Sequence, residues 1–494
     1  MKNTVKILSV LLIITMLFCS CGKAAENNPE STTTAPDSTT GQATDTMQRT
    51  GTVRLPFNAA DGVNPFFARS YENLYLARLL YSSLFAVSSS YEPILSVAES
   101  INISGVTATV KVKSGLECHG SNQLTGADVV YSFYKAKNSY AYADMLSTVD
   151  SAVASGNVVE FTSKFADSFV AAKLTFPIVK ADTADLQTDI PTGYGEYYFY
   201  ENTLVSTSGK KENIRLIPVN TSDTSFNAYK IGNTDIFFSD LSDCNYAQSH
   251  GNAQSADINN MIYLGFNSEL GGLNKNIRSA IAVLLNSEDI CSESYQGHAL
   301  PCKLPCNPGS VNYKENENIL LSGDAKKAAD IIDRLGYTRY AGKALTNGAY
   351  VLSFSLLVNA DNKYRVAAAY EIADTLNSAG FYIEVKALPF EEYSERIASG
   401  NYQIYLGEVK LDLSLDLSQF FLEDGTLSSG IDKENIAKAY FNMRSGKISC
   451  TEFYDAFIAS YPFVPIAFRT GYIFTSNNFR GDFSHFPYEL YYRF

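Results

Sequence analysis

Two periodic patterns of apolar residues alternate along the chain from about residue 51 onward. Alternating apolar and polar residues over Val106–Lys113, closed by Ser114 and Gly115, predict a half-buried strand. Thr125 and Asp128 have the spacing of a capping box, with Asp in place of the usual Glu. We therefore predict a helix that begins after Thr125 and buries one apolar face, formed by Val129, Val130, Phe133 and Ala136.

The second half of the chain continues this mixture of helices and strands. Asp324 is positioned to cap a helix that ends at Gly336, and a longer helical pattern over 367–379 ends at Gly380. Strand patterns occupy Phe381–Ala387, Tyr402–Val409 and Phe463–Arg469. Interspersed helices and strands predict an α/β fold. No apolar run after the first 20 residues is long enough to span a membrane.

The first 20 residues have the pattern of a secretory signal. Lys2 and Lys6 precede an apolar run, Ile7–Phe18, which is shorter than the roughly 20 residues needed to cross a bilayer. The segment Phe18–Gly22 (FCSCG) resembles the lipobox of bacterial lipoproteins, in which a peptidase cuts before a cysteine that is then acylated. Small residues flank Cys21, so we predict that residues 1–20 are removed and that Cys21 is lipidated. An ordinary cleaved signal is the alternative.

Residues 21–50 are predicted to form a disordered tether. Between Gly22 and Thr50 there are ten Ser and Thr residues and no large aliphatic or aromatic residue except Met47. Such a segment does not bury enough apolar surface to fold. A flexible chain of this length has an r.m.s. reach of roughly 30 Å. The folded part would therefore be anchored at the outer face of the bacterial cytoplasmic membrane.

Composition and charge narrow the class of protein. The 494 residues are 46% hydrophobic and 18% charged, which excludes disorder of the whole chain. This length predicts about two to four domains or one two-lobed body. Lys and Arg number 39 against 52 Asp and Glu, so the net charge is -13 and nucleic-acid binding is not expected. Tryptophan is absent, so any ring stacking has to come from Tyr and Phe.

Cysteines lie outside the leader at positions 118, 244, 291, 302, 306 and 450. His298, Cys302 and Cys306 form one local cluster of possible metal ligands, but no second pair at zinc-site spacing accompanies them. Pro301 and Pro305 precede the two cysteines and indicate a rigid loop. We predict free thiols, with a Cys302–Cys306 disulfide as the alternative, and expect neither a metal site nor a cofactor.

Seven short segments match the motifs of one known family in the correct order. The longest is Val110–Phe133, a strand, a turn and then the sequence LTGADVVYSF. The others are Val63–Phe67 (VNPFF), Leu79–Phe85 (a helix in the family), Pro191–Tyr197 (PTGYGEY), Tyr263–Asn267, Ile277–Ile281 and Gly380–Val385. Over nearly all of residues 51–480 the chain thus resembles the extracellular solute-binding family that includes oligopeptide- and dipeptide-binding proteins of ABC importers.

The resemblance implies two lobes joined by a hinge, with the ligand enclosed between them. The first lobe is expected to comprise residues 51–265 and 470–494, with a subdomain near 70–175. Residues 266–469 would form the second lobe, and Tyr263–Asn267 would be the strand that crosses between them. The implied fold class is α/β, of the two-lobed periplasmic-binding-protein type (type II, peptide-binding class).

The resemblance also implies where a ligand binds. Peptide-binding members hold the peptide as an added strand and contact its ammonium with an Asp in a segment that corresponds to Gly407–Phe420. Two aspartates survive there, although the family's Trp is missing and Leu417 replaces its Pro; the alternative is solvated loop carboxylates. Asn359 stands where dipeptide binders carry an Arg, with Lys363 and Arg365 nearby, so a strict dipeptide binder is not expected. The candidate ligand contacts are Asp412, Asp416, Asn359, Asn64 and Tyr194.

Together these features predict a lipid-anchored, monomeric binding protein that delivers extracellular oligopeptides to an ABC permease and its ATPase. A receptor for another solute, such as an oligosaccharide or a metal chelate, is one alternative. A lipoprotein that senses peptides without importing them is another. The one hydrolase-like match is an isolated SxxK at Ser208–Lys211, so the chain is not expected to be an enzyme.

Overall fold

The computed structural model describes residues 52–120, 122–242, 252–317, 323–339, 344–477 and 479. The predicted leader and tether, Cys21, Cys244 and residues 480–494 lie outside these ranges. The chain divides into one unit of residues 1–50 and a second of residues 51–494, and the description below concerns the second. Within the described ranges, no helix combines the length and apolarity that a membrane crossing requires.

The N-terminal part of the folded unit contains two four-stranded sheets and a hairpin. One sheet has the order β1-β10-β9-β8, and the other has the order β4-β5-β7-β6. The strands are β1 (Arg54–Asn58), β2 (Phe85–Val87), β3 (Pro93–Leu95), β4 (Ala98–Ser104), β5 (Thr107–Val112), β6 (Val149–Ser155), β7 (Val158–Ser163), β8 (Tyr197–Tyr200), β9 (Thr203–Ser206) and β10 (Ile214–Val219). The helices are α1 (Tyr71–Leu80), α2 (Gly126–Lys137), α3 (Ser222–Lys230) and the 3-10 helix η1 (Val170–Lys173). Buried residues between Val53 and Ala256, together with Ile473, form the first core.

The remaining residues build one mixed sheet with helices around it. Its strand order is β11-β19-β12-β18-β16-β17, and β13 pairs with β19. The strands are β11 (Ile236–Ser239), β12 (Asn252–Phe266), β13 (Ala299–Pro301), β16 (Ser353–Asn359), β17 (Tyr382–Leu388), β18 (Ile404–Lys410) and β19 (Phe463–Thr475), with β14 (Thr338–Arg339) and β15 (Leu345–Thr346) forming a separate pair. The helices are η2 (Gly271–Leu273), α4 (Lys275–Leu284), α5 (Ser287–Glu293), α6 (Val311–Lys314), α7 (Ala325–Arg334), α8 (Lys363–Ser378), α9 (Phe390–Ala398), α10 (Ser418–Phe421), α11 (Ile436–Arg444) and α12 (Cys450–Ser460). Buried residues between Met261 and Phe468 form the second core.

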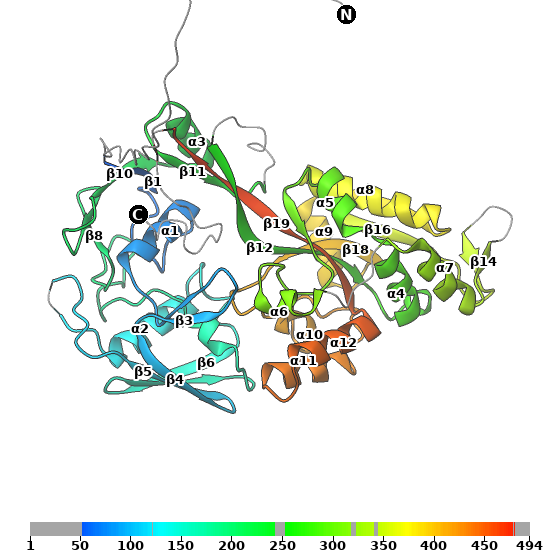
Figure 1. Cartoon of the computed structure of the whole chain (residues 1–494), viewed down its shortest axis with the longest axis horizontal. Coiled ribbons are helices and arrows are strands. Elements are labelled where there is room, and N and C mark those ends of the chain that lie inside the picture. The colour runs from blue at the N-terminus through cyan, green and yellow to red at the C-terminus, as the bar shows by residue number, and fades with distance from the viewer. Residues whose placement is uncertain are drawn as a thin grey trace, which may run out of the picture. The chain divides into compact units, whose positions relative to one another are not determined.

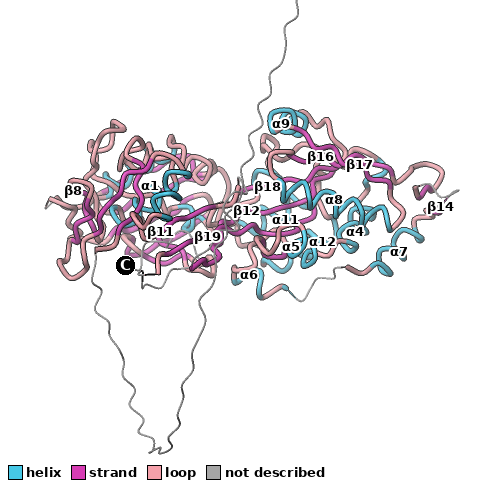
Figure 2. The backbone as a smooth tube through the Cα atoms, turned by 90° about the horizontal axis from the view of Figure 1, so that it is seen from above, coloured by secondary structure: helices cyan, strands magenta, loops and turns pink. Residues whose placement is uncertain are grey.

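Strands β12 and β19 contribute to both cores. Ala256 and Ile473 belong to the first core, whereas the second core contains residues from Met261 onward in β12 and up to Phe468 in β19. The two strands pair antiparallel along their length and run side by side between the part that carries α1 and the part that carries α4 (Figures 1 and 2). Their register shifts between Asp257 and Asn260, where a bulge bends the strand. A bent strand pair therefore connects the two cores.

Most predicted elements are present, with ends shifted by a few residues. Helix α2 begins after Thr125, whose backbone N–H and hydroxyl donate to the Asp128 carboxylate at 2.8 Å. The Asp324 carboxylate accepts the N–H of Lys327 at 2.9 Å and caps α7. The longer predicted helix is α8, and the three strand patterns that follow it correspond to β17, β18 and β19.

Two expectations about element ends were wrong. The helix expected over Leu79–Phe85 ends at Leu80, because the chain becomes extended at Tyr81 and the N–H of Ser82 donates to the carbonyl of Tyr194 at 2.6 Å. Strand β19 continues past Arg469 to Thr475, because these further residues pair with both β11 and β12.

The cysteine prediction is confirmed for the described residues. Cys302 and Cys306 are both buried and are free thiols, as are Cys118, Cys291 and Cys450. The loop that carries Cys302 and Cys306 is thus held by packing rather than by a disulfide.

Candidate functional site

The segment 411–417, between β18 and α10, contributes to two cavities, each lined by residues from the part of the chain before β11 and from the part after β12. Leu413, Leu415 and Leu417 face the larger cavity, whereas Asp412 and Asp416 face the smaller one. The same short segment therefore presents an apolar side and an acidic side to two different spaces between the cores.

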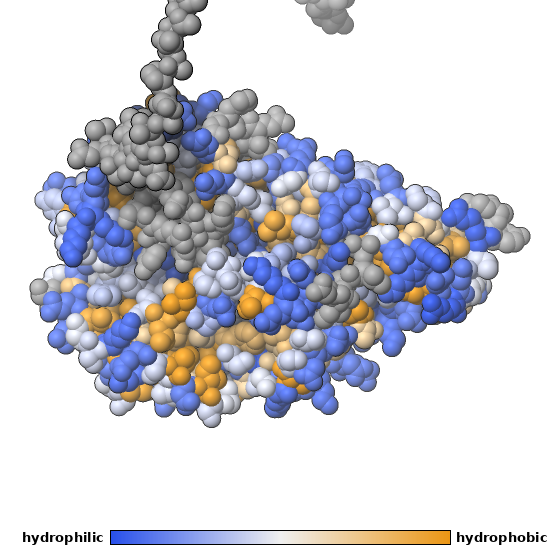
Figure 3. All heavy atoms as spheres, viewed as in Figure 1, coloured by the Kyte–Doolittle hydropathy of each residue, from blue (hydrophilic) through white to orange (hydrophobic). Residues whose placement is uncertain are grey.

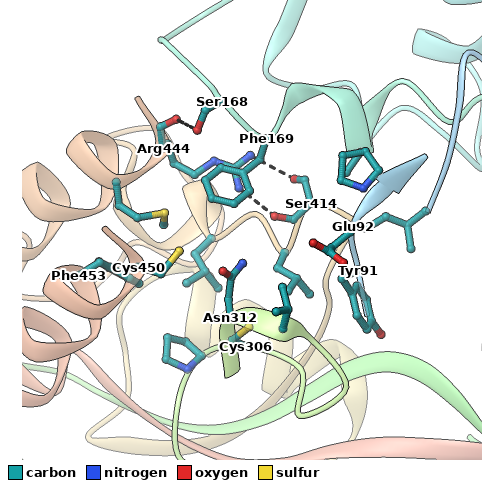
Figure 4. Close-up of a pocket in the computed structure, with 18 of the residues that line it drawn as sticks. Tyr91, Glu92, Ser168, Phe169, Cys306, Asn312, Ser414, Arg444, Cys450 and Phe453 are labelled. Atoms are coloured by element: carbon teal, nitrogen blue, oxygen red, sulfur yellow. Dashed lines mark hydrogen bonds between the residues drawn. The ribbon is translucent and has the colours of Figure 1, made fainter. Parts of the chain in front are cut away.

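The larger cavity has a volume of about 310 Å³, at the lower end of the range for small-molecule pockets. Figure 4 shows the Phe169 ring lying against the Arg444 side chain, with Ser414 beside them. The Arg444 Cζ atom lies 4.6 Å from the ring centroid, and Nη1 donates to the Ser414 carbonyl at 2.9 Å. Arg444 is thus paired within the protein. The other walls of this cavity are mainly apolar, with Glu92 and Asn312 as further polar groups.

Two thiols also line the larger cavity, those of Cys306 and Cys450. Burial raises the pKa of Cys306 to about 11 and also raises the pKa of Cys450. Protonated thiols are poor metal ligands. The described ranges also contain no group of three or more His, Cys, Asp or Glu side chains placed to hold a metal ion.

The smaller cavity is acidic. Asp144, Met145 and Ser147 line it from the N-terminal part of the folded unit, and Lys410, Asp412 and Asp416 line it from β18 and the segment that follows. Lys173, the last residue of η1, is fully buried beside these aspartates. Its ammonium donates to the Thr148 hydroxyl at 2.6 Å and forms an ion pair with the Asp416 carboxylate. A buried cation of the first core thus neutralises an anion of the second.

The two predicted aspartates differ in their surroundings. Asp416 accepts hydrogen bonds from the Tyr440 hydroxyl and the Ser418 N–H in addition to Lys173. Burial alone would raise the pKa of Asp416, but the cations Lys173 and Arg444 hold that pKa well below its usual range. Asp416 is therefore ionised and fully engaged within the protein.

The two carboxylate oxygens of Asp412 differ, because Oδ1 accepts hydrogen bonds and Oδ2 has only a distant cation. Its Oδ1 accepts the backbone N–H groups of Ser414 at 2.9 Å and Asp416 at 3.1 Å, and also the Ser414 hydroxyl. Its Oδ2 lies 3.9 Å from the Lys173 ammonium, which is beyond hydrogen-bond distance. Burial raises the pKa of Asp412 more than Lys173 lowers it. A further cation at Oδ2 would therefore stabilise the ionised form of Asp412.

The balance of charges around Lys173 favours such a cation. The Asp167 carboxylate lies 2.7 Å from Arg444 Nη2 and 3.8 Å from the Lys173 ammonium. Three carboxylates (Asp167, Asp412 and Asp416) therefore share two cations, Lys173 and Arg444, and one negative charge is in excess.

A second buried cluster lies along the same strand. Glu408 of β18 accepts from Arg469 Nε at 2.8 Å and from the Asn260 amide at 2.6 Å, and it forms an ion pair with Arg365 at the start of α8. Burial alone would raise the pKa of Glu408, but Arg469 and Arg365 lower it below the usual value. Here two guanidinium groups share one carboxylate.

The other predicted contacts lie elsewhere. Asn64 is fully buried, and its amide donates to the Leu186 carbonyl at 2.8 Å. Asn359 is also buried, and it accepts the N–H of Asp361 at 3.0 Å. Asn64, Asn359 and Tyr194 line neither of the two cavities, whereas the structure does bring Asp412 and Asp416 together.

Sequence reasoning missed two buried cations, Lys173 beside the aspartates and Arg469 beside Glu408. Lys173 interrupts the mostly apolar run Phe169–Val179, and Arg469 lies within the mostly apolar strand β19. A single charged residue inside an apolar stretch is a recognisable signal of a buried ion pair, because an unpaired buried charge is costly. The identity of its partner comes only from the fold.

A family model and a curated relative match most of the folded unit. The model of the bacterial extracellular solute-binding proteins, family 5 (middle region) matches residues 91–423. The oligopeptide-binding protein AppA of Bacillus subtilis (strain 168) is 22% identical over 444 residues, which cover 81% of this chain and 79% of that protein.

Solved structures share the fold. The oligopeptide-binding protein AppA from Bacillus subtilis in complex with a nonapeptide has a TM-score of 0.57 at 19% identity, over 90% of this chain and 97% of that chain. The periplasmic murein tripeptide binding protein MppA, in its unliganded open form, has a TM-score of 0.68 at 15% identity, over 87% and 95%. A nickel ABC transporter protein from Bacillus halodurans has a TM-score of 0.69 at 15% identity, over 86% and 95%. These likenesses confirm the predicted two-lobed α/β fold class.

Proposed function

Because the chain belongs to the bacterial extracellular solute-binding proteins of family 5, we propose that it is the lipid-anchored peptide receptor of an ABC importer. Proteins of this family bind solutes, so the chain is a binding protein and not an enzyme. The similarity to an oligopeptide-binding protein over most of both chains makes peptides the first class of ligand to test.

The excess carboxylate beside the smaller cavity is the observation that carries the peptide assignment. Lys173 and Arg444 leave one of the three carboxylate charges uncompensated, and a peptide ammonium at Asp412 Oδ2 would compensate it. A charge-assisted hydrogen bond of this kind is stronger than one between neutral groups. Asp416 would act by holding Lys173 in place rather than by contacting the ligand.

The connection between the cores supports a hinge. We assign the first core and the second core to the two lobes, which β12 and β19 join. Asn259 sits in the bulge of β12 with a φ of +58°, and its amide donates to the carbonyls of Leu411 and Asp412 at 3.0 Å. A change of angle at this bulge would therefore move the acidic segment directly.

Membrane attachment follows from the leader. Lipidation of Cys21 and a tether of residues 21–50 would hold a monomeric receptor near its permease and ATPase partners. One acyl chain alone binds a protein to a membrane only weakly, so stable anchoring needs a second chain or another membrane-binding feature. A diacylated cysteine provides two chains.

The test begins with the ligand that the protein carries. We expect mass spectrometry of the purified protein, opened in denaturant, to release peptides longer than two residues. Calorimetry with a recovered peptide should show a 10- to 150-fold loss of affinity in Asp412→Asn, because a hydrogen bond to a charged group contributes about 1.5–3 kcal/mol. Asp455→Asn, at an exposed position of α12, is the matched control and should bind normally.

Other outcomes identify the alternatives. Recovery of a metal chelate would favour the function of the nickel-related structural neighbour, and recovery of an oligosaccharide would point to sugar uptake. If the protein binds peptides but a strain that lacks it still takes up peptides normally, sensing is favoured over import. Normal affinity in Asp412→Asn would remove this carboxylate from the site.

A further inference from the structure

The larger cavity takes no part in the proposed peptide contact, which uses Asp412 and the smaller cavity. The two cavities border the same segment, 411–417, but they share no lining residue. Glu92 and Ser168, which line the larger cavity, are exposed, so this cavity reaches the surface. A small molecule in the larger cavity would therefore leave the place beside Asp412 open.

The walls of the larger cavity suit an aromatic molecule. The rings of Phe169 and Phe453 line it together with three sulfur-containing side chains, Met443, Cys306 and Cys450. Sulfur atoms make favourable contacts with the edges of aromatic rings. The volume of about 310 Å³ is about twice the roughly 150 Å³ of a cavity that encloses benzene. One or two fused rings with a short chain would therefore fill the cavity.

One charge in this cavity is uncompensated. Among the described residues that line it, Glu92 and Arg444 are charged, and Arg444 Nη2 lies 2.7 Å from the Asp167 carboxylate, which neutralises it. The Glu92 carboxylate and the Asn312 side-chain amide have no ion pair or hydrogen bond among the described residues. Figure 4 shows both groups extending into the space beside Phe169. This space would attract a cation and repel an anion.

We propose that the larger cavity is a second binding site, for a small aromatic amine: one or two fused rings on a short chain that ends in a primary ammonium. The ring would contact Phe169 and the sulfur-containing side chains, and the ammonium would meet the Glu92 carboxylate and the Asn312 amide oxygen. A free amino acid fits less well, because its carboxylate would lie near Glu92 while Arg444 is already paired. This site is additional to the proposed peptide function and does not depend on it.

Tryptamine is a suitable probe because the chain contains no tryptophan. Its indole emission can be excited at wavelengths that tyrosine does not absorb, so the protein contributes no background. On titration with the full-length protein we expect the fluorescence anisotropy of tryptamine to saturate with a Kd below about 1 mM. Indole propionate, which carries a carboxylate in place of the ammonium, should bind at least about five-fold more weakly. Phenethylamine should displace tryptamine more effectively than cyclohexylethylamine, which has no aromatic ring.

Variants place the two parts of the ligand. Glu92→Gln should bring the ratio of tryptamine affinity to indole propionate affinity close to one. Because the ratio compares two ligands on the same protein, a general loss of stability leaves it unaffected. Glu160→Gln, at an exposed position of β7 outside the cavity, is the matched control and should keep the wild-type ratio. Val311→Phe adds a ring to the cavity wall and should weaken both ligands at least about ten-fold.

The amine site and the peptide function fail in different ways. If tryptamine does not saturate, if wild type binds the two indoles equally, or if Val311→Phe binds them as wild type does, the amine site is overturned. If a peptide recovered from the protein competes with tryptamine, the larger cavity is a side-chain pocket of the peptide site, and the second site is overturned. If no peptide binds but tryptamine binds with a ratio that depends on Glu92, the amine site stands and the peptide function is wrong.

Discussion

Replacing the buried Lys173 by Met should destabilise the folded unit more than removing any single charge from its surface or its loops. The lysine has no exposed surface, and its ammonium lies within 3.9 Å of Asp167, Asp412 and Asp416. Met keeps the apolar stem and removes only the charge, so three buried carboxylates would share Arg444 alone. Removing one partner of a buried ion pair typically costs about 3–5 kcal/mol, because the remaining charge is left without compensation.

Acidification should narrow the difference between wild type and Lys173→Met. The pKa of Asp416 is lowered in the folded state, so its ion pair contributes stability above the ordinary Asp pKa of about 3.9 and loses that contribution as the pH falls through the lower folded value. The free energies of unfolding should therefore differ most near pH 7 and converge below about pH 4.

Urea unfolding provides the assay. The chain has no tryptophan and 33 tyrosines, so circular dichroism and tyrosine emission are the suitable probes. Lys438→Met, an exposed lysine of α11, is the control and should change the free energy by less than about 0.5 kcal/mol. A loss below about 1 kcal/mol for Lys173→Met at pH 7, or a difference that does not depend on pH, would refute the account of this charge cluster.

Two further predictions concern the cysteines. Cys21→Ala should leave the protein unprocessed or release it into the medium, and fractionation of cells with blotting of the membrane fraction measures this; normal processing with full membrane retention would contradict lipidation at Cys21. Cys302 and Cys306 should resist iodoacetamide at pH 8 in the folded protein, because both are buried and the pKa of Cys306 is raised to about 11. Both should react fully in urea without a reductant, and protection that persists in urea would indicate the disulfide instead.

Local elements could be predicted because their causes are local. The capping box of Thr125 and Asp128, the Asp324 cap and the alternation along β5 each depend on residues within a few positions of one another. Where an element depends on distant pairing, prediction from the chain failed. The length of β19 depends on β11 and β12, which lie more than 200 residues away in the sequence, and the end of α1 depends on a contact with Tyr194.

By itself, the sequence determined the class of protein, the mixed α/β fold and the two aspartates of the 407–420 segment, since ordered motifs and periodicity are properties of the chain alone. Only the tertiary structure decided what those aspartates contact. Lys173 precedes Asp416 by 243 residues, and Arg365 precedes Glu408 by 43, so nothing in their local sequence pairs them. Burial removes these charges from water, and the energy of a charge without water depends on which opposite charges the fold brings within a few ångströms of it.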